Sequence, residues 1–327
     1  MIQIKPNYKV AIVCTTFNHE DYISDAIESF LAQKCSFDFQ IIVHDDASSD
    51  QTASIIKSFE EKYPDRIVAI YQSENQYSKG VEGKLNKNQM INDLIDSEYV
   101  AICEGDDYWI NPNKLQMQVD FLDEHPDYSA STHRAKVFDV KRNRFIKSTG
   151  TKSKILTAED MIIGGGGIVP TASIVCRRDL YKLPPFGLYL GFGDYQRQIF
   201  LALYGDIRNF KEEMSVYRTN VPYSWTSRIK QAATESRINH QKTKMNLLIE
   251  LDEFTNRKFS NAIELKILEM QLDLFINYKE NIVELAYKID LLSPVIIFST
   301  SKCKSENRLV RRICRIVSLF KLLLSRI

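Results

Sequence analysis

Residues 98–109 read Glu-Tyr-Val-Ala-Ile-Cys-Glu-Gly-Asp-Asp-Tyr-Trp, and the interpretation of the whole chain starts from this stretch. The apolar run 99–103 predicts a buried strand. That strand ends directly at three carboxylates, Glu104, Asp106 and Asp107. Adjacent carboxylates repel one another, so a fold that gathers them at a strand end usually supplies a cation, and a hard divalent metal ion is the natural candidate. The alternative is a solvated acidic turn. A second acidic cluster at residues 45–46 favours the metal.

The composition is that of a globular protein large enough for one big domain or two. The 327 residues are 44% hydrophobic, and 43 basic residues nearly balance 42 acidic ones, which gives nucleic-acid binding no support. None of the six cysteines forms a Cys-x-x-Cys pair, so neither a zinc site nor a disulfide framework is indicated. The N-terminus lacks an apolar signal core, and no apolar stretch is long enough to span a bilayer. We therefore expect a cytoplasmic protein with reduced cysteines.

Strand and helix patterns alternate through the first half of the chain. The predicted strands are 10–14, 39–43, 67–71 and 99–103. The predicted helices are 22–31, 48–62 with Ser48 or Ser49 as its cap, 88–95, and one that Pro112 opens. A loop rich in Gly, Lys and Asn precedes the third helix. This alternation predicts a parallel, doubly wound α/β sheet.

The second half has a different character. Its predicted elements are a strand at 129–140, a flexible run at 164–167, a helix that opens at 191–195 and extends to Tyr204, and a strand at 214–217. From about residue 227 onward the pattern is helical. We therefore expect a domain over 1–225, with a nucleotide-binding half (1–127) and an acceptor half (128–225). A helical region would follow over 226–327.

Three polar clusters fall at predicted strand ends, at residues 15–18, 45–50 and 104–107. In doubly wound sheets, ligands bind outside the carboxyl ends of the strands. The chain has no Gly-x-Gly-x-x-Gly fingerprint and no Gly-Lys-Ser/Thr sequence. Phosphate would therefore have to be held by a metal ion and side chains rather than by a glycine cradle.

The order and spacing of three motifs resemble family 2 glycosyltransferases with a GT-A fold. The motifs are Val-Ala-Ile-Val-Cys-Thr-Thr-Phe-Asn at 10–18, Asp-Asp-Ala-Ser-Ser-Asp at 45–50 and Glu-Gly-Asp-Asp-Tyr-Trp at 104–109. The resemblance covers about residues 8–225. It implies a Rossmann-like nucleotide-sugar-binding domain with a mixed central sheet, followed by a helical C-terminal region. The third motif is similar to that of bacterial enzymes that build capsular, O-antigen or similar surface polysaccharides.

The resemblance also implies roles on the donor side of the site. Thr15 and Phe17 would flank the nucleobase, and Asp46 would accept a hydrogen bond from it, which suits uracil or thymine. Asp107 would bind a Mn²⁺ or Mg²⁺ ion that bridges the two phosphates, and Asp106 would contact the ribose or the metal. The implied substrate-binding residues are Thr15, Phe17, Asn18, Asp46, Ser48, Lys84, Asp106, Thr171 and Trp225.

Two further segments complete the implied donor site. The basic loop 79–87, which contains Lys84, would reach the diphosphate, and a solvated mobile loop is the alternative. Asn220 stands where many members of the family have the histidine of a Tyr-Arg-x-His sequence. A third protein ligand for the metal is therefore not evident, and water or Asn220 would complete the coordination.

On the acceptor side, the resemblance implies that Asp194 is the general base. It lies at a predicted helix start, where the helix N-terminus stabilises a carboxylate, and the glycines before it permit close approach of a sugar. A simple N-cap aspartate is the alternative. Thr171 belongs to the acceptor-side segment, and Trp225 either lines the cleft or packs the domain. The implied reaction is inverting sugar transfer from a nucleoside-diphosphate sugar to a hydroxyl of a glycan or lipid-linked acceptor.

Two other functions compete with this interpretation. A nucleotidyltransferase that forms a nucleotide sugar also binds a nucleotide and a metal ion on a similar fold. It normally has a Gly-rich, basic N-terminal loop, which residues 15–20 lack. An inactive scaffold that binds nucleotide sugars would need the loss of a key carboxylate, yet all of them are present. Residues 301–327 hold eight basic residues against one acidic residue around an apolar stripe. This pattern predicts a helix that lies on an anionic membrane, here the inner face of the plasma membrane, and the alternatives are packing on the domain or a homodimer seam.

Overall fold

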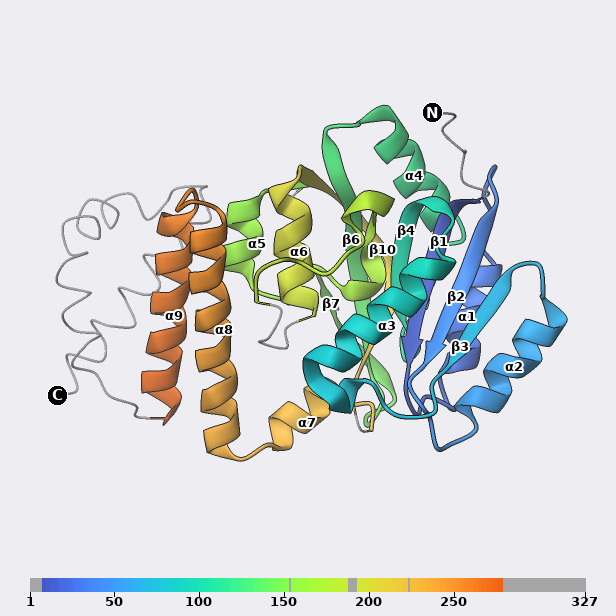
Figure 1. The fold of residues 1–327 in the computed structure, drawn as a ribbon, viewed down its shortest axis with the longest axis horizontal. Helices are drawn as coiled ribbons and strands as arrows, with labels where there is room; N and C mark the ends of the chain where they lie inside the picture. Colours follow the sequence, from blue (N-terminus) through green and yellow to red (C-terminus); the bar gives the residue numbers. More distant parts are fainter. Residues whose placement is uncertain (1–7, 153, 188–192, 223, 279–327) are drawn as a thin grey trace. The chain divides into compact units, whose positions relative to one another are not determined.

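The structure, a computed structural model, describes residues 8–152, 154–187, 193–222 and 224–278. The chain divides into two units, residues 1–231 and residues 232–327. The first unit contains the sheet and the second contains a helical hairpin (Figure 1). Helix α7 (Trp225–Gln231) belongs to the first unit. The expected domain boundary at 225/226 stays a prediction.

The first half of the sheet is parallel, as the sequence predicts. Its strands follow the spatial order β3 (Ile67–Tyr71), β2 (Phe39–Asp45), β1 (Tyr8–Thr16) and β4 (Ser97–Glu104). Cys14 of β1 pairs with Val43 of β2 on one side and with Cys103 of β4 on the other. These apolar runs form central strands because helices cover both faces of a parallel sheet. The carboxyl ends of β1, β2 and β4 therefore meet at one edge.

The second half makes the sheet mixed, which confirms the predicted fold class. The spatial order continues from β4 through β9 (Val175–Arg177), β6 (Tyr128–Asp139), β10 (Asp206–Thr219) and β5 (Tyr108–Trp109). Strand β9 is antiparallel to both β4 and β6, whereas β10 runs parallel to β6. The short β7 (Arg144–Thr149) and β8 (Ile155–Leu156) pair with β6 and β10. Strand β5 forms the end of the acidic motif (residues 104–109), and its pairing with β10 ties that motif to the second half of the domain.

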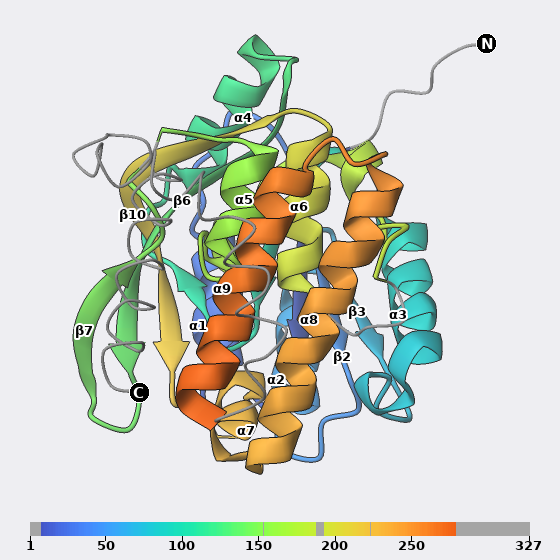
Figure 2. The same ribbon diagram turned by 90° about the vertical axis from the view of Figure 1, so that its left-hand side faces the viewer.

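Helices lie on both sides of this sheet (Figures 1 and 2). They are α1 (Ile23–Leu31), α2 (Thr52–Lys62), α3 (Gly80–Leu94), α4 (Lys114–Glu124), α5 (Ala158–Gly164) and α6 (Asp194–Leu203). Short 3₁₀ turns are η1 (Tyr77–Lys79), η2 (Thr171–Ser173) and η3 (Arg178–Leu180). Helices α1, α2 and α4 cover one face of the parallel strands. Helix α3 covers the other face, where Gln40 Nε2 of β2 donates to the Leu94 carbonyl at 3.1 Å.

Two local predictions are wrong. Helix α2 begins at Thr52 with Gln51 at its N-cap, so neither Ser48 nor Ser49 caps it. The segment 79–87 is not a loop, because α3 begins at Gly80. A Cβ atom on Gly83 would lie 1.8 Å from the Gln76 carbonyl oxygen, so the first turns of α3 pack tightly against the η1 segment. This packing overrides the weak helix propensity of a Gly- and Asn-rich sequence.

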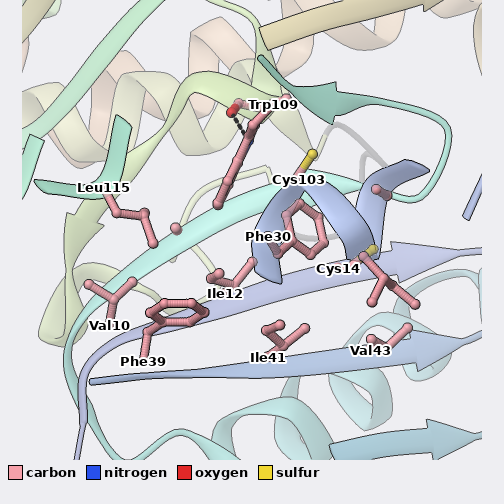
Figure 3. Packing of buried hydrophobic residues seen from close by; sticks show 14 of the residues in the cluster. Val10, Ile12, Cys14, Phe30, Phe39, Ile41, Val43, Cys103, Trp109 and Leu115 are labelled. Atoms are coloured by element: carbon pink, nitrogen blue, oxygen red, sulfur yellow. Dashed lines mark hydrogen bonds between the residues drawn. The ribbon is translucent and has the colours of Figure 1, made fainter. Parts of the chain in front are cut away.

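The main core lies between the parallel strands and the helices α1, α2 and α4. Figure 3 shows Ile12 of β1 and Ile41 of β2 beneath the Phe30 ring of α1. The Phe30 ring packs on Trp109 with the ring centroids 4.7 Å apart. Trp109 Nε1 donates to the Ala172 carbonyl at 2.9 Å, so the buried indole joins the end of the acidic motif to the η2 turn.

The described part of the second unit consists of α8 (Thr234–Phe254) and α9 (Ser260–Tyr278). They pack against each other through buried side chains that include Leu247, Leu251 and Ile263. Across the described ranges, no helix has both the length and the apolar character that crossing a membrane requires. The predicted amphipathic helix at 301–327 lies outside the described residues.

Candidate active site

The acidic motif turns sharply at the end of β4. The Asp107 N–H donates to the Glu104 carbonyl at 3.0 Å, which closes a tight turn around Gly105. A Cβ atom on Gly105 would lie 2.6 Å from Thr16 Oγ1 and 3.1 Å from His19 Nδ1. Only glycine fits this position, so the ends of β1 and β4 approach each other more closely than any side chain would permit.

Two of the carboxylates at this edge interact with Asp194. Burial, and after it the negative charge of Asp194, raise the pKa of Glu104 well above its usual range. Burial also raises the pKa of Asp107 well above its usual range, with Asp106 as the next cause and a smaller contribution from Asp194. The structure therefore brings Asp194 of α6 to the acidic motif of β4, although 87 positions separate it from Asp107 in the chain.

Arg218 holds the motif from the neighbouring strand β10. Its backbone N–H donates to Asp107 Oδ1 at 2.8 Å, and its Nη1 donates to the Asp106 carbonyl at 2.9 Å. Its Nη2 forms an ion pair with Asp25 of α1. The guanidinium lies over the Tyr108 ring, with Cζ 4.4 Å from the ring centroid. The sequence signal for this residue is the Tyr-Arg-Thr-Asn segment at 217–220, where the family resemblance draws attention to Asn220 instead.

His19 is a second residue that sequence reasoning missed. It follows the first polar cluster, and its Nδ1 lies 3.1 Å from Thr16 Oγ1. Its Nε2 lies 4.0 Å from Asp106 Oδ2. Burial lowers the pKa of His19, and the charge of Asp106 opposes that shift. The imidazole therefore stands between the end of β1 and the acidic motif.

The first two polar clusters are joined by hydrogen bonds. Asn18, with a φ of 54°, accepts a hydrogen bond from the Ser49 N–H at 2.8 Å through its side-chain oxygen. The Asn18 N–H in turn donates to Ser48 Oγ at 2.8 Å. Ser48 also donates through its N–H to Asp45 Oδ2 at 3.2 Å, so Asp45 supports the turn. Thr15 lies half-buried at the end of β1, before these contacts.

Asp46 and Phe17 lie at the same edge of the sheet. The carboxylate of Asp46 accepts hydrogen bonds from the backbone N–H groups of Gln76 at 2.7 Å and Tyr77 at 3.1 Å. These bonds fix the start of η1 and orient the Asp46 side chain. Phe17 is half-buried. The nucleobase roles that the resemblance implies for both residues stay predictions.

Two lysines of α3 lie near the carboxylates. Burial lowers the pKa of Lys84, and the neighbouring charge of Lys87 lowers it further. Burial lowers the pKa of Lys87 too, while the negative charges of Asp46, Glu104 and Asp194 oppose that change. Lys87 belongs to the basic segment 79–87 that the resemblance places near the diphosphate, and it is the lysine on which the carboxylates of the acidic edge act.

The acceptor-side residues come from three separate segments. Asp194 is exposed at the first position of α6, and Gly193 stands at the N-cap with no side chain to accept a backbone hydrogen bond. Thr171 is half-buried in η2, the turn that Trp109 anchors. Trp225 begins α7, and its side chain lies outside the described residues.

The donor set fits a hard cation in charge and in atom type. Burial is the largest cause of the raised pKa values of Glu104 and Asp107, and the negative charges of the neighbouring carboxylates, Asp106 among them, add to it. Among the residues that the structure describes, no three His, Cys, Asp or Glu side chains are arranged to hold a metal ion by themselves. Asn220 donates through Nδ2 to Asp139 at 2.9 Å and is therefore engaged elsewhere. An ion at Asp107 would need nucleotide phosphates or water as further ligands.

Comparison with solved structures defines the class of this fold. The structure of TarS residues 1–349 from Staphylococcus aureus with UDP-GlcNAc aligns with a TM-score of 0.59 at 18% identity, over 85% of this chain and 75% of that chain. This likeness confirms the GT-A fold. A family model described as glycosyl transferase family 2 matches residues 11–182, more than half of the chain. The chain belongs to glycosyltransferase family 2.

Two curated relatives illustrate the range of the family. A Mycobacterium tuberculosis protein is 29% identical over 226 residues, which are 67% of this chain and 61% of the relative. The putative teichuronic acid biosynthesis glycosyltransferase TuaG of Bacillus subtilis is 30% identical over 113 residues, which are 35% of this chain and 41% of TuaG. The chain thus spans less than two thirds of the length of these relatives.

Proposed function

We propose that this protein is an inverting glycosyltransferase that moves a sugar from a nucleoside-diphosphate sugar to a hydroxyl of a glycan or lipid-linked acceptor. The observation that carries the proposal is the convergence of Asp194 with Glu104, Asp106 and Asp107 at one edge of the sheet. Membership of family 2 supports transfer chemistry. The acceptor would belong to a bacterial surface polysaccharide such as a capsule, an O-antigen or a wall polymer.

In this proposal, Asp194 accepts the proton of the acceptor hydroxyl, and the oxygen attacks the anomeric carbon of the donor. The nucleoside diphosphate leaves from the opposite face, so the anomeric configuration inverts. Exposure of Asp194 at the start of α6 leaves its carboxylate accessible to an acceptor. General-base catalysis of this kind typically contributes about 10²- to 10⁴-fold in rate.

Asp106 and Asp107 would hold a Mn²⁺ or Mg²⁺ ion together with the diphosphate. A bound divalent ion offsets the negative charge that develops on the leaving diphosphate. Arg218 orients Asp107 through its backbone N–H and fixes the turn through the Asp106 carbonyl. Asp107 would therefore present its second carboxylate oxygen to the ion.

The nucleotide would lie across the ends of β1 and β2, with its base between Thr15 and Phe17 and near Asp46. The joined loops of Asn18 and Ser48 would form the wall of this pocket. We favour a uridine or thymidine diphosphate. The S. aureus TarS structures contain UDP and UDP-GlcNAc, which supports a uridine nucleotide for this chain as well.

Residues 301–327 would attach the protein to the inner face of the plasma membrane. The support is their sequence pattern, with eight basic residues and one acidic residue. Flotation of the full chain with vesicles that contain anionic phosphatidylglycerol tests this idea. The double variant Arg311→Glu/Arg312→Glu should stay in the dense fraction. If the unaltered protein does not float, the attachment is refuted. If the double variant floats as the unaltered protein does, these two arginines do not hold the protein to the membrane.

Thermal-shift screening of nucleoside diphosphates, with and without Mn²⁺, tests the nucleotide and the metal together. We expect UDP or dTDP to raise the melting temperature in a metal-dependent manner. Asp107→Ala should abolish the dependence on Mn²⁺, which calorimetric titration would measure. If no nucleoside diphosphate stabilises the protein, or if Asp107→Ala titrates like the unaltered protein, the proposed donor site is wrong.

A further inference from the structure

The hairpin of β6 and β7 carries a strongly basic surface outside the proposed site. Between residues 136 and 147 the one acidic residue, Asp139, is buried. Five basic side chains in this segment are exposed, namely Lys136, Lys141, Arg142, Arg144 and Lys147. Within the described ranges only Arg142 of these five is in an ion pair, with Asp139 at 3.3 Å. The hairpin therefore presents several uncompensated positive charges to solvent, although the net charge of the whole chain is only +1.

Two large apolar side chains are exposed among these charges. Phe145 is 55% exposed and Ile146 is 41% exposed. The Phe145 ring packs edge-on against Phe138 across the hairpin with the ring centroids 5.1 Å apart, and Lys136 Nζ lies 5.8 Å from the Phe145 centroid. The register of the hairpin shifts at this point, so Ile146 lies in a β-bulge without a partner across the hairpin. Adjacent exposed apolar side chains with a polar rim are typical of a surface that contacts a protein or a membrane.

The hairpin leaves the sheet at the same edge as the acidic motif. Because β9 is antiparallel to both β4 and β6, the carboxyl ends of β4 and β6 lie at one edge. Strand β6 ends at Asp139, and its Phe138 is in register with Arg218, the residue whose N–H donates to Asp107. Among the described strands β7 pairs with β6 alone, and Figure 2 shows it at the margin of the sheet. The turn 140–143 therefore lies at the same edge as the proposed donor site.

We propose that the β6–β7 hairpin is a docking surface for an anionic lipid bilayer, with its cations at the headgroups and with Phe145 and Ile146 inserted between them. Binding of this kind combines attraction of basic residues to an anionic leaflet with burial of apolar area. A soluble acidic polymer would use the cations but leave the two apolar side chains in water, so a lipid surface fits both observations better. Stable attachment usually takes two weak signals, and the hairpin would be the second beside the tail 301–327.

Docking through the hairpin has a consequence for the choice of acceptor, and only this consequence rests on the proposed function. With the hairpin on the bilayer, the edge of the sheet that holds Asp107 would face the lipid headgroups. A lipid-linked acceptor would then reach the site without leaving the membrane, whereas a soluble glycan would gain nothing from the docking. The inference therefore favours the lipid-linked class among the proposed acceptors.

The charges alone have another explanation, because basic side chains on an edge strand prevent it from pairing with another chain. Phe145 and Ile146 work against that role, since exposed apolar residues on an edge strand promote association. A strand that was shaped only to stay unpaired would not expose them. Removal of the charges and removal of the apolar pair must therefore be tested separately.

Flotation of the full chain with vesicles tests the charges. Vesicles of phosphatidylcholine with phosphatidylglycerol are compared with phosphatidylcholine alone, and we expect binding only to the anionic vesicles. Lys141→Gln/Arg144→Gln should lower the partition coefficient at least about tenfold, the effect of two cations near an anionic leaflet. Lys57→Gln/Lys62→Gln, which removes two exposed charges from α2, is the matched control and should bind as the unaltered protein does. The proposal is overturned if the unaltered protein does not bind, or if the hairpin variant and the control have the same partition coefficient.

Phe145→Ser/Ile146→Ser tests the apolar pair at constant net charge. We expect the partition coefficient to fall at least about fivefold, because the burial of both side chains in lipid is lost. The melting temperature of each variant shows that it is folded. If this variant binds as the unaltered protein does while the charge variant fails, the hairpin attracts polyanions by charge alone, and the lipid proposal is overturned.

A tryptophan in the hairpin reports its own contact with lipid, separately from the tail. Phe145→Trp is mixed with anionic vesicles whose phosphatidylcholine carries brominated acyl chains, which quench tryptophan on contact. We expect quenching beyond that of the unaltered protein. Tyr71→Trp, at an exposed aromatic position of β3 at the other end of the strand order, is the control and should add none. Absence of added quenching in Phe145→Trp overturns the proposal even if the protein floats, because another segment would then hold it.

These assays need neither nucleotide nor acceptor, so they separate docking from sugar transfer. If the hairpin binds vesicles but no nucleoside diphosphate stabilises the protein, the docking stands and the proposed donor site fails. If a nucleoside diphosphate binds but Phe145→Trp shows no added quenching, the docking fails and the glycosyltransferase proposal stands.

Discussion

The backbone N–H of Arg218 donates a hydrogen bond of 2.8 Å to the carboxylate of Asp107, across 111 positions of sequence. Asp107 is only 2% exposed, so this bond fixes the orientation of a buried carboxylate. The Arg218 side chain donates a hydrogen bond to the Asp106 carbonyl and forms an ion pair with Asp25, and both interactions hold the Arg218 backbone in place. The acidic motif is therefore held in place from a strand that arises late in the chain.

Arg218→Met should loosen this arrangement. The variant keeps the backbone donor but loses the hydrogen bond to Asp106 and the ion pair with Asp25, so we expect about 1–3 kcal/mol less stability to urea and weaker Mn²⁺-dependent binding of UDP. Asp25→Asn is the control, because Asp25 is 55% exposed and such ion pairs contribute little. Equal nucleotide affinity in Arg218→Met and the unaltered protein would contradict the positioning role.

Gly105→Ala should distort the end of β1. The added methyl group would lie 2.6 Å from Thr16 Oγ1, so Thr16 and His19 would have to move. Overpacking of this kind costs about 1–3 kcal/mol, and we expect both a lower melting temperature and weaker nucleotide binding. Gly167→Ala is the matched control, since a Cβ there meets no atom within 4 Å. If Gly105→Ala and Gly167→Ala have the same melting temperature, the close approach at Gly105 does not contribute to stability.

Asp194→Asn should reduce the rate of transfer by at least about 100-fold while nucleotide affinity is kept. The substitution retains size and hydrogen bonding at the start of α6 but removes the proton acceptor. Assay with the donor sugar and calorimetry with UDP give the two readouts. A nearly normal rate would exclude Asp194 as the base. The same variant should also lower the pKa of Glu104, because the charge of Asp194 helps to raise it.

Lys114 should make stability depend on pH. It is fully buried in the first turn of α4, with Nζ 4.0 Å from the Trp109 ring centroid and Cys35, Cys103 and His133 as its titratable neighbours. Burial lowers the pKa of Lys114 to about 7 from 10.5. Between these two values the unfolded chain binds one more proton than the folded chain, so the free energy of unfolding rises with pH across this window.

Lys114→Met removes that pH dependence. Below about pH 7 the variant should be more stable than the unaltered protein by a few kcal/mol, because no charged amine is buried, and the difference should fade toward pH 10.5. Urea unfolding at about pH 7, 8.5 and 10 measures the trend across that window. Lys57→Met changes an exposed residue of α2, so its free energy of unfolding should differ from that of the unaltered protein by the same amount at all three pH values. Parallel stability curves for the unaltered protein and Lys114→Met would contradict a lowered pKa.

Much of the parallel half of the sheet could be predicted from sequence. The runs 10–14 and 39–43 are apolar at every position apart from Gln40, as strands buried on both faces must be, and they form β1 and β2. The rule that ligands gather at the carboxyl ends of strands correctly placed the three polar clusters at one edge. Local patterns suffice when both the strand and its neighbours are encoded by consecutive apolar residues.

The features that local patterns do not reveal depend on contacts between distant segments. Helix α3 begins at Gly80 rather than near residue 88, and its Gly83 packs against Gln76, a contact that no local propensity reveals. The antiparallel position of the short strand β9 between β4 and β6 likewise has no local signal. Lys87 looks like an ordinary helical residue in the sequence, and only the folded chain brings its charge near those of Asp46, Glu104 and Asp194.

The pairing of β5 with β10 has a consequence for synthesis of the chain. When residues 98–109 leave the ribosome, neither the strand that pairs with Tyr108 and Trp109 nor the N–H that orients Asp107 has been made. More than 100 further residues must be translated before β10 can dock. A nascent chain that stops before β10 would therefore carry every residue of the acidic motif but lack the contacts that hold Asp107 in the proposed donor site. Assembly of the donor site is thus a late event, coupled to completion of the whole domain.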